Sequence, residues 1–180
     1  MTFALTLDGG LRLVLAEPHH AEPIAGLMLR NQERLAVWQP WAAYRPSVES
    51  TRSYIRGCLD RFAEGRELYL MIEHEGVPVG ACGMRRDPQT LIADIGYWLD
   101  AAAEGKGLVT RAVTALTEAA FDVYGMRRVE IRTMVTNKRA RAVAERCGYE
   151  LEGVLRKAMR FADRNEDVAL YAVVERHGRR

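Results

Sequence analysis

A turn with two glycines near the middle of the chain could bind a phosphate group. The run 104–110 (EGKGLVT) follows an alternating apolar stretch and leads directly into residues with helical periodicity. The first N–H groups of a helix have no intrahelical acceptor and lie at the positive end of its dipole, so anions bind there favourably. Gly105 and Gly107 would allow the close approach of a pyrophosphate, and Lys106 adds a positive charge. A tight turn without a ligand is the alternative, because the dinucleotide-binding and Walker patterns are both absent.

The elements around this turn follow a mixed order. Apolar runs predict strands at 3–7, 11–15, 68–73, 77–85, 91–99, 129–135, 151–161 and 168–174. Helical spacing predicts one helical region from Pro18 to Pro40 and helices at about 47–63, 109–123 and 138–146. This order is neither a regular strand–helix alternation nor an all-strand pattern. We therefore expect an α/β fold of the α+β kind, with one mixed sheet and helices on both of its faces.

Length and composition predict a single domain over residues 1–180, with its core at about 10–175, because 180 residues suffice for one hydrophobic core. The net charge is +2, and basic residues are scattered among acidic ones apart from the tail at 176–180, so we expect no nucleic-acid partner. No apolar run approaches the roughly 20 residues of a membrane span. The first residues also lack the features of a signal peptide, so we expect a cytoplasmic protein without a membrane partner.

Cysteine and histidine spacing predicts no metal site. Cys58, Cys82 and Cys147 are far apart and odd in number, without a C-x-x-C pair, which argues against a disulfide framework or a zinc site. We interpret them as buried or half-buried thiols. The histidines also lack the spacing of metal ligands.

Three motifs carry a resemblance to a known family. The run 104–109 is similar to the Q/R-x-x-G-x-G/A loop of GNAT acyltransferases, with Glu104 in place of Gln or Arg and Val109 in place of Gly or Ala. Residues 137–149 (NKRARAVAERCGY) resemble the N-x-x-S-x-x-V-x-E-K-x-G-F run of the ribosomal-protein alanine/serine N-terminal acetyltransferases within this family. The run 152–156 (EGVLR) follows at the distance expected in the same branch.

The motif 38–41 (WQPW) also resembles this branch, so the similarity spans nearly the whole chain. The protein is identified as a member of the GNAT superfamily, whose enzymes transfer an acyl group, usually acetyl, from coenzyme A to an amine. The resemblance implies a single GNAT domain whose sheet is mainly antiparallel and whose central parallel pair, at 92–99 and 129–135, splays apart. The unpaired backbone groups of these strands would bind the pantetheine arm of acetyl-CoA as an added strand would.

The resemblance also implies which residues contact acetyl-CoA. The expected contacts are the backbone of Trp98 and Leu99, the loop and helix residues Glu104, Gly105, Lys106, Gly107, Leu108, Val109 and Thr110, and the side chain of Asn137. Asn137 could equally cap the helix at 138–146, and the two roles do not exclude each other.

Amine acylation by a thioester requires a neutral amine, a polarised carbonyl and a proton for the departing thiolate. We expect direct transfer without a covalent enzyme intermediate, with the oxyanion held by a backbone N–H near Trp98 or Leu99. Ala140 and Met159 stand where related enzymes often carry a serine and a carboxylate, so the acid and base stay unassigned. The candidates are Tyr149 as the acid and Glu33, Asp94 or Glu152 as a base acting through water.

The acceptor is expected to enter between aromatic side chains. Trp38 and Trp41 could wall an amine entrance, although one of them could instead attach these helices to the sheet. The resemblance favours a protein N-terminus, such as that of a ribosomal protein, as the acceptor. The alternatives are a small amine such as a polyamine or an aminoglycoside, succinyl-CoA as the donor, and a coenzyme A-binding protein without turnover. We also expect a homodimer, because family members are often dimers and the C-terminal strands can offer a free edge.

Overall fold

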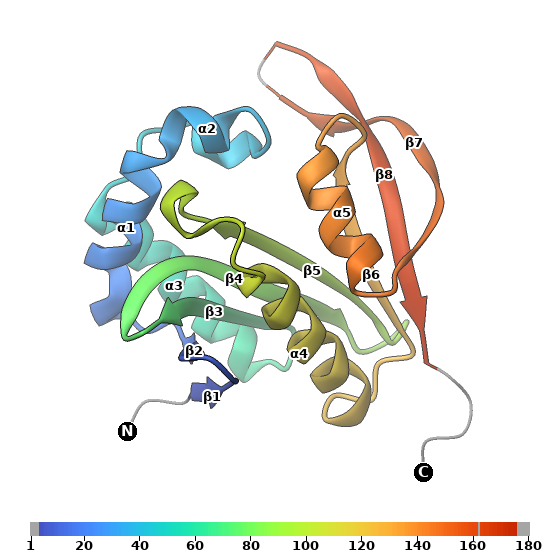
Figure 1. Cartoon of the computed structure of the whole chain (residues 1–180), viewed down its shortest axis with the longest axis horizontal. Coiled ribbons are helices and arrows are strands. Elements are labelled where there is room, and N and C mark those ends of the chain that lie inside the picture. Colours follow the sequence, from blue (N-terminus) through green and yellow to red (C-terminus); the bar gives the residue numbers. More distant parts are fainter. Residues whose placement is uncertain (1–3, 162, 176–180) are drawn as a thin grey trace.

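A computed structural model describes residues 4–161 and 163–175, which form one eight-stranded sheet covered by helices (Figure 1). In chain order the strands are β1 (Ala4–Thr6), β2 (Leu11–Leu15), β3 (Glu67–His74), β4 (Val77–Asp87), β5 (Ile92–Leu99), β6 (Arg128–Met134), β7 (Glu150–Arg160) and β8 (Asn165–Val174). Their order in the sheet is β1-β2-β3-β4-β5-β6-β8-β7, and among these strands only β5 and β6 pair in parallel. The expected mixed sheet with a central parallel pair is confirmed.

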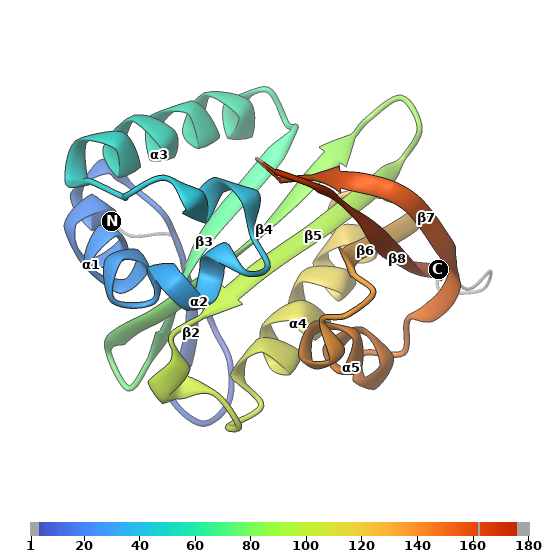
Figure 2. The same cartoon turned by 90° about the horizontal axis from the view of Figure 1, so that it is seen from above.

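The helices cover both faces of this sheet. They are α1 (Ala21–Arg30), α2 (Gln32–Ala36), α3 (Val48–Ala63), α4 (Leu108–Asp122) and α5 (Lys138–Arg146), with short 3₁₀ turns at Pro18–His20, Pro40–Ala43 and Ala101–Ala103. Helices α1 and α3 lie on one face, and α4 and α5 lie on the other (Figure 2). No helix in the described ranges is long and apolar enough to cross a membrane.

Strand alternation decides which side chains of β5 face which layer. Ala93, Ile95 and Leu99 belong to the buried cluster that contains the apolar face of α4. Trp98 packs instead against the cluster formed by α1, α3 and the first strands. Successive side chains of a strand point to opposite faces, so Asp94 and Gly96 share the face of Trp98. The face of β5 that carries Asp94, Gly96 and Trp98 is the one considered for the acceptor side of the site.

The region from Pro18 to Pro40 differs from the expected single helical region. Helix α1 ends at Arg30, and α2 begins at Gln32, with Asn31 outside helical geometry at φ −108° and ψ 6°. The buried Asn31 side chain donates to the carbonyl of Leu27 and to Asp100, at the end of β5. The hydrogen bond from Asn31 to the distant Asp100 is therefore favoured over a continuous helix at this position.

The other elements lie within two residues of their expected ends, except that the strand expected at 168–174 begins earlier, at Asn165. Ser47 caps α3 by accepting from the N–H of Ser50 at 3.0 Å, and α5 has the expected bounds. All three cysteines are free thiols, two of them buried and Cys147 half-buried. Phe3 and the tail 176–180, which entered the expectations above, lie outside the described residues.

Ile55 on α3 provides a test of how this helix is fixed to the sheet. Its side chain is fully buried against Val14, Ile24 and Met71. Ile55→Ala should lower the free energy of unfolding by about 2–5 kcal/mol, because it removes apolar contacts and leaves a cavity. Urea denaturation would measure this loss. Val48→Ala, at an exposed position of the same helix, should change stability by less than about 1 kcal/mol, and an equal loss in both variants would contradict the packing described here.

Candidate active site

The two parallel strands at the centre of the sheet separate soon after they meet. β5 pairs with β6 only over Ile92–Asp94 and Arg128–Glu130, after which the strands diverge (Figure 2). From 95 to 99 and from 131 to 134, the facing strand edges have no strand partner. The divergence opens a cleft of about 750 Å³, lined by both strands, the 104–110 turn, α2 and α5.

One end of the cleft has the properties of an anion site. Gly105 and Gly107 have positive φ angles of 80° and 69°, and a Cβ built at either would meet no atom within 4 Å. Gly107 is the N-cap of α4 and supplies no side chain to cap it. The N–H groups of the first helical turn, beginning at Leu108, are therefore free to donate to a ligand. The residues fit the diphosphate of coenzyme A, since backbone donors surround a space without side chains.

Glu104 joins two arginines across this end of the cleft. Its carboxylate pairs with Arg34 of α2 at 2.6 Å and also with Arg139 of α5. Arg34 donates in addition to the carbonyl of Leu99 and to the side chain of Asn31. The two guanidinium groups offset the negative charge that Glu104 brings to the anion site.

A buried polar network extends from Arg34 to the end of β5. Asn31 donates to Asp100 at 3.2 Å and accepts from the N–H of Ala101 at 3.1 Å, while Arg30 pairs with Asp100 at 2.7 Å. Burial raises the pKa of Asp100, but the hydrogen bonds from Arg30 and Asn31 outweigh this effect and hold the pKa below its usual value. Helices α1 and α2 are thus fixed to the segment that leads into the anion site.

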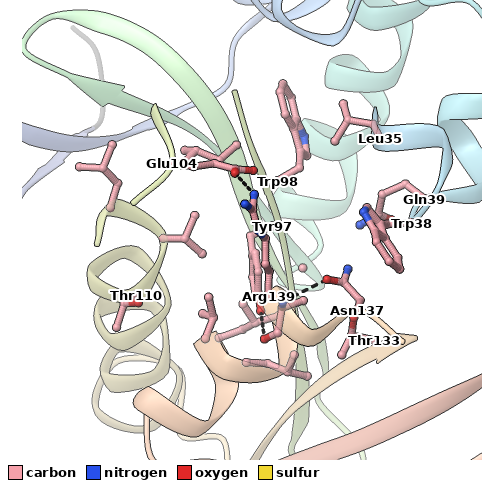
Figure 3. Close-up of a pocket in the computed structure, with 18 of the residues that line it drawn as sticks. Leu35, Trp38, Gln39, Tyr97, Trp98, Glu104, Thr110, Thr133, Asn137 and Arg139 are labelled. Carbon is pink, nitrogen blue, oxygen red and sulfur yellow. Dashed lines mark hydrogen bonds and ion pairs between the residues drawn. The ribbon is translucent and has the colours of Figure 1, made fainter. Parts of the chain in front are cut away.

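The opposite side of the cleft carries apolar and amide side chains. Leu35, Trp38 and Gln39 line it, and Figure 3 shows Trp38 and Gln39 across the cleft from Thr110 on α4. Trp41 does not line the cleft. Its ring centroid lies 6.3 Å from that of Trp98, and its side chain is 40% exposed.

The expected contact residues for acetyl-CoA come together in this cleft with one exception. The residues that line it are Trp98, Leu99, Glu104, Gly105, Gly107, Leu108, Val109, Thr110 and Asn137. Lys106 is exposed and does not line the cleft. Asn137 caps α5 by accepting from the N–H of Ala140 at 3.1 Å while it lines the cleft, so the two roles considered for it are geometrically compatible.

The four candidate acid and base residues lie outside the cleft lining. Tyr149 is buried with its hydroxyl 2.6 Å from that of Thr117, and burial raises its pKa. Glu152 pairs with Arg128 at 2.8 Å, which lowers the pKa of this carboxyl, and Glu33 is exposed on α2.

Asp94 differs from the other three candidates. Its Oδ1 atom is buried without a hydrogen-bond partner. Burial raises the pKa of Asp94, although Arg132 and Arg85 oppose the shift. It lies two residues before Gly96, which lines the cleft, and on the same face of β5.

Several cleft residues were not foreseen from the sequence. These are Arg34, Gln39, Tyr97, Arg132, Thr133 and Arg139. Tyr97 donates to the carbonyl of Ala140 at 3.0 Å and so links β5 to α5. The position of Tyr97 in the strand before the glycine turn could have indicated that it lines the cleft. The pairing of Arg34 with Glu104 has no local signal in the sequence.

Comparison with known proteins places the chain in one family. The family model for the acetyltransferase (GNAT) domain matches residues 11–150. The chain belongs to the GNAT acetyltransferase family. The expected resemblance is confirmed, and the protein is an N-acetyltransferase that uses acetyl-CoA. Within the described residues, no three His, Cys, Asp or Glu side chains are grouped so that they could hold a metal ion.

Two curated relatives are similar to this GNAT chain over nearly its full length. A ribosomal-protein-serine acetyltransferase of Escherichia coli (strain K12) is 31% identical over 173 residues, which cover 96% of this chain and 97% of the relative. A putative ribosomal N-acetyltransferase, YdaF, of Bacillus subtilis (strain 168) is 30% identical over 176 residues, covering 97% and 96%.

Solved structures of GNAT enzymes show the same arrangement. The RimL ribosomal L7/L12 alpha-N-protein acetyltransferase in complex with coenzyme A has a TM-score of 0.92 at 27% identity, covering 96% of this chain and 98% of that one. The microcin C7 self-immunity acetyltransferase MccE, in complex with acetyl-CoA and AMP, has a TM-score of 0.88 at 29% identity, covering 93% and 94%.

Gly107→Ala tests the anion site. A methyl group at this position would occupy the space beside the N-terminus of α4, so the affinity for acetyl-CoA in calorimetry should fall at least about tenfold, or 1.4 kcal/mol. Left-handed backbone strain will also cost about 1 kcal/mol of stability. Gly125→Ala is the matched control, because Gly125 has a similar φ of 64° and open space but lies outside the cleft. Equal affinities in the two variants would refute the assignment.

Proposed function

We propose that the protein acetylates the N-terminal amine of a polypeptide, of the kind found on ribosomal proteins. The charge of the cleft carries this proposal. Among the described residues that line it, Glu104 is the one carboxylate and is already paired with two arginines. Arg146 adds further positive charge, and Arg132 is paired with Glu130 at 2.7 Å. A polyamine or an aminoglycoside brings several positive charges and would be disfavoured here. A peptide N-terminus brings a single amine.

The shape of the acceptor side supports the same acceptor. Leu35 and Trp38 offer apolar surface, and the side chain of Gln39 offers an amide donor and an acceptor for a peptide backbone. Two relatives of nearly equal length are named as ribosomal acetyltransferases, and a similar structure is that of an enzyme named for α-N-acetylation of a ribosomal protein. These names support the polypeptide acceptor over a small amine.

In the proposed reaction, the acetyl-CoA thioester supplies the acetyl group and the acceptor amine attacks it directly. Backbone donors from Gly107 into the first turn of α4 hold the diphosphate, and the free edges of β5 and β6 hold the pantetheine arm. The N–H of Asp100 donates to the carbonyl of Val79 on β4 at 2.7 Å. Neighbouring residues in extended backbone turn their N–H groups to opposite sides, so the N–H of Leu99 points into the cleft. We assign to it the oxyanion contact.

Asp94 is the proposed proton acceptor, acting through water. It is half-buried on the acceptor face, with a buried, unpartnered carboxylate oxygen and a raised pKa, and a raised pKa makes a carboxylate a stronger proton acceptor. A water molecule is needed, because Asp94 lies two residues from the cleft residue Gly96, about 7 Å along an extended strand.

The remaining assignments follow from the proposed acceptor and from the edge of the sheet. A ribosomal-protein acceptor would place the enzyme in the cytoplasm, and the whole chain would act as one acetyltransferase domain. β7 is an edge strand, and Leu151, Val154 and Leu155 on it are exposed apolar side chains. These features support a homodimer formed through β7.

Thiol release from acetyl-CoA tests the acceptor. We expect turnover with peptides that begin with Ser, Ala or Met, and a kcat/KM at least about a hundredfold lower for spermidine and aminoglycosides, because the cleft lacks free carboxylates for them. Succinyl-CoA, measured in parallel, defines the acyl donor. Turnover with small amines alone would overturn the polypeptide acceptor.

Asp94→Asn tests the proposed base. The variant should lose about a hundredfold in kcat/KM at pH 7, since a positioned base contributes at least that much. Because the pKa of Asp94 is raised, the wild-type rate should fall as the pH drops through that pKa, where the carboxyl becomes protonated. In the variant, the acidic limb should move up to the pKa of the peptide amine, about 7.7–8.0. The control is Asp122→Asn, at an exposed position of α4, and an unshifted limb in Asp94→Asn would exclude this role.

A further inference from the structure

We propose that a second cavity binds an acidic side chain of the acceptor polypeptide, a few residues beyond the acetylated N-terminus. The cavity has a volume of about 330 Å³ and is lined by Arg61, Arg66, Glu67, Arg85 and Arg86. This inference rests on the proposed function, because it concerns the residues of the acceptor polypeptide that follow the reacting amine.

Guanidinium groups dominate the accessible part of this cavity. The Glu67 side chain is only 6% exposed and pairs with Arg61 and, at 3.6 Å, with Arg85, whose side chains are 41% and 71% exposed. The carboxylate therefore lies beneath the arginines that it holds. Each arginine has five N–H donors, so one buried carboxylate leaves most of them free for a ligand.

The other two arginines contribute unequally. Arg86 alternates with Arg85 along β4 and turns toward the α4 side of the sheet, where its guanidinium lies 3.8 Å from the ring centroid of Tyr124. Arg66 makes an exposed pair with Glu64 at 3.4 Å. Such a pair is weak in water and leaves Arg66 available to a better-placed anion.

Strand register places this cavity beside the acceptor side of the cleft. Glu67, Arg85 and Asp94 are direct neighbours on β3, β4 and β5. Two residues farther along these strands, Gly83 pairs with Gly96, which is exposed and lines the cleft. Gly96 carries no side chain, so an extended polypeptide could leave the cleft over Gly96 toward Arg85, whereas Tyr69 of β3 occupies the row beyond Gly83.

The distance sets which acceptor residue would reach the cavity. Arg85 lies one strand to the side of Gly96 and two residues along, which corresponds to about 8 Å. Glu67 lies two strands to the side and two residues along, which corresponds to about 12 Å. An extended chain covers these distances in three to four residues. Aspartate or glutamate at the third to fifth position of the acceptor would therefore meet the arginines, which bind carboxylates through paired, charge-assisted hydrogen bonds.

Two series of peptides test the inference by thiol release at saturating acetyl-CoA. Both series begin with the same residue, and one carries Asp or Glu singly at positions 2 to 8 where the other carries Asn or Gln. We expect kcat/KM to be about tenfold higher for the acidic peptides, with a maximum at positions 3 to 5. The preference should shrink at 0.5 M salt, because the arginines are exposed.

Arg85→Gln should reduce the acidic-to-neutral ratio from about ten to below two, and Arg85→Glu should invert it in favour of peptides with Lys at these positions. Arg85 also faces Asp94, so either variant changes the pKa of Asp94 and the rate with every peptide. The ratio between peptides cancels this effect. Arg12→Gln is the matched control, because Arg12 is 43% exposed and pairs with Glu73 at 3.0 Å near the opposite end of β3. The acidic-to-neutral ratio of this variant should stay near ten.

The outcomes separate this inference from the proposed function. If no peptide is acetylated while small amines are, the polypeptide acceptor itself is wrong and the inference fails with it. If peptides are acetylated without an acidic preference, only the arginine cavity loses its assigned ligand. Inhibition by a short RNA without an acidic preference among peptides would assign the cavity to nucleic acid and overturn the inference. A ratio near ten that persists in folded Arg85→Gln would also overturn it.

Discussion

The site depends on two neighbouring strands that stop pairing. β5 and β6 share three residue pairs and then diverge, so the N–H and C=O groups on their facing edges have no strand partner. A buried backbone group without a partner costs about 1–3 kcal/mol, so such a gap is stable only when water or a ligand with matching polar groups fills it. The pantetheine arm contains amides and can pair with these edges. In the proposed binding mode, the protein holds its co-substrate largely with backbone that its own sheet leaves free.

The gap needs fixed sides, and two hydrogen-bonded contacts supply them. Tyr97 of β5 reaches the carbonyl of Ala140 in α5, and Arg34 of α2 reaches the carbonyl of Leu99. The first contact links β5 to the helix that follows β6. The second links β5 to α2, which begins the acceptor wall formed by Leu35, Trp38 and Gln39. Because Asn31 also bonds to both Arg34 and Asp100, the position of the acceptor wall is coupled to the position of the anion site.

Local patterns in the sequence were sufficient for the parts of the site that are made of backbone. Glycine spacing, helical periodicity and the capping ability of Asn137 act within a few residues, and the anion turn, α4 and α5 were predicted from them. The break at Asn31 could not be predicted in this way, because its side chain bonds to a residue 69 positions away. The pair of Arg34 with Glu104 spans 70 positions and likewise leaves no local signal.

Glu104 shows how such distant contacts change the meaning of a motif. A carboxylate beside a diphosphate site would by itself repel the ligand and weaken the favourable field of the α4 dipole. With Arg34 and Arg139 paired to it, the group of three carries a net positive charge, and the carboxylate orients two guanidiniums at the edge of the cleft. The departure from the usual Gln or Arg is therefore compensated by residues outside the loop motif. A motif-based assessment of this loop would underestimate its affinity for anions, because the compensating charges come from two helices that the loop meets only in the folded chain.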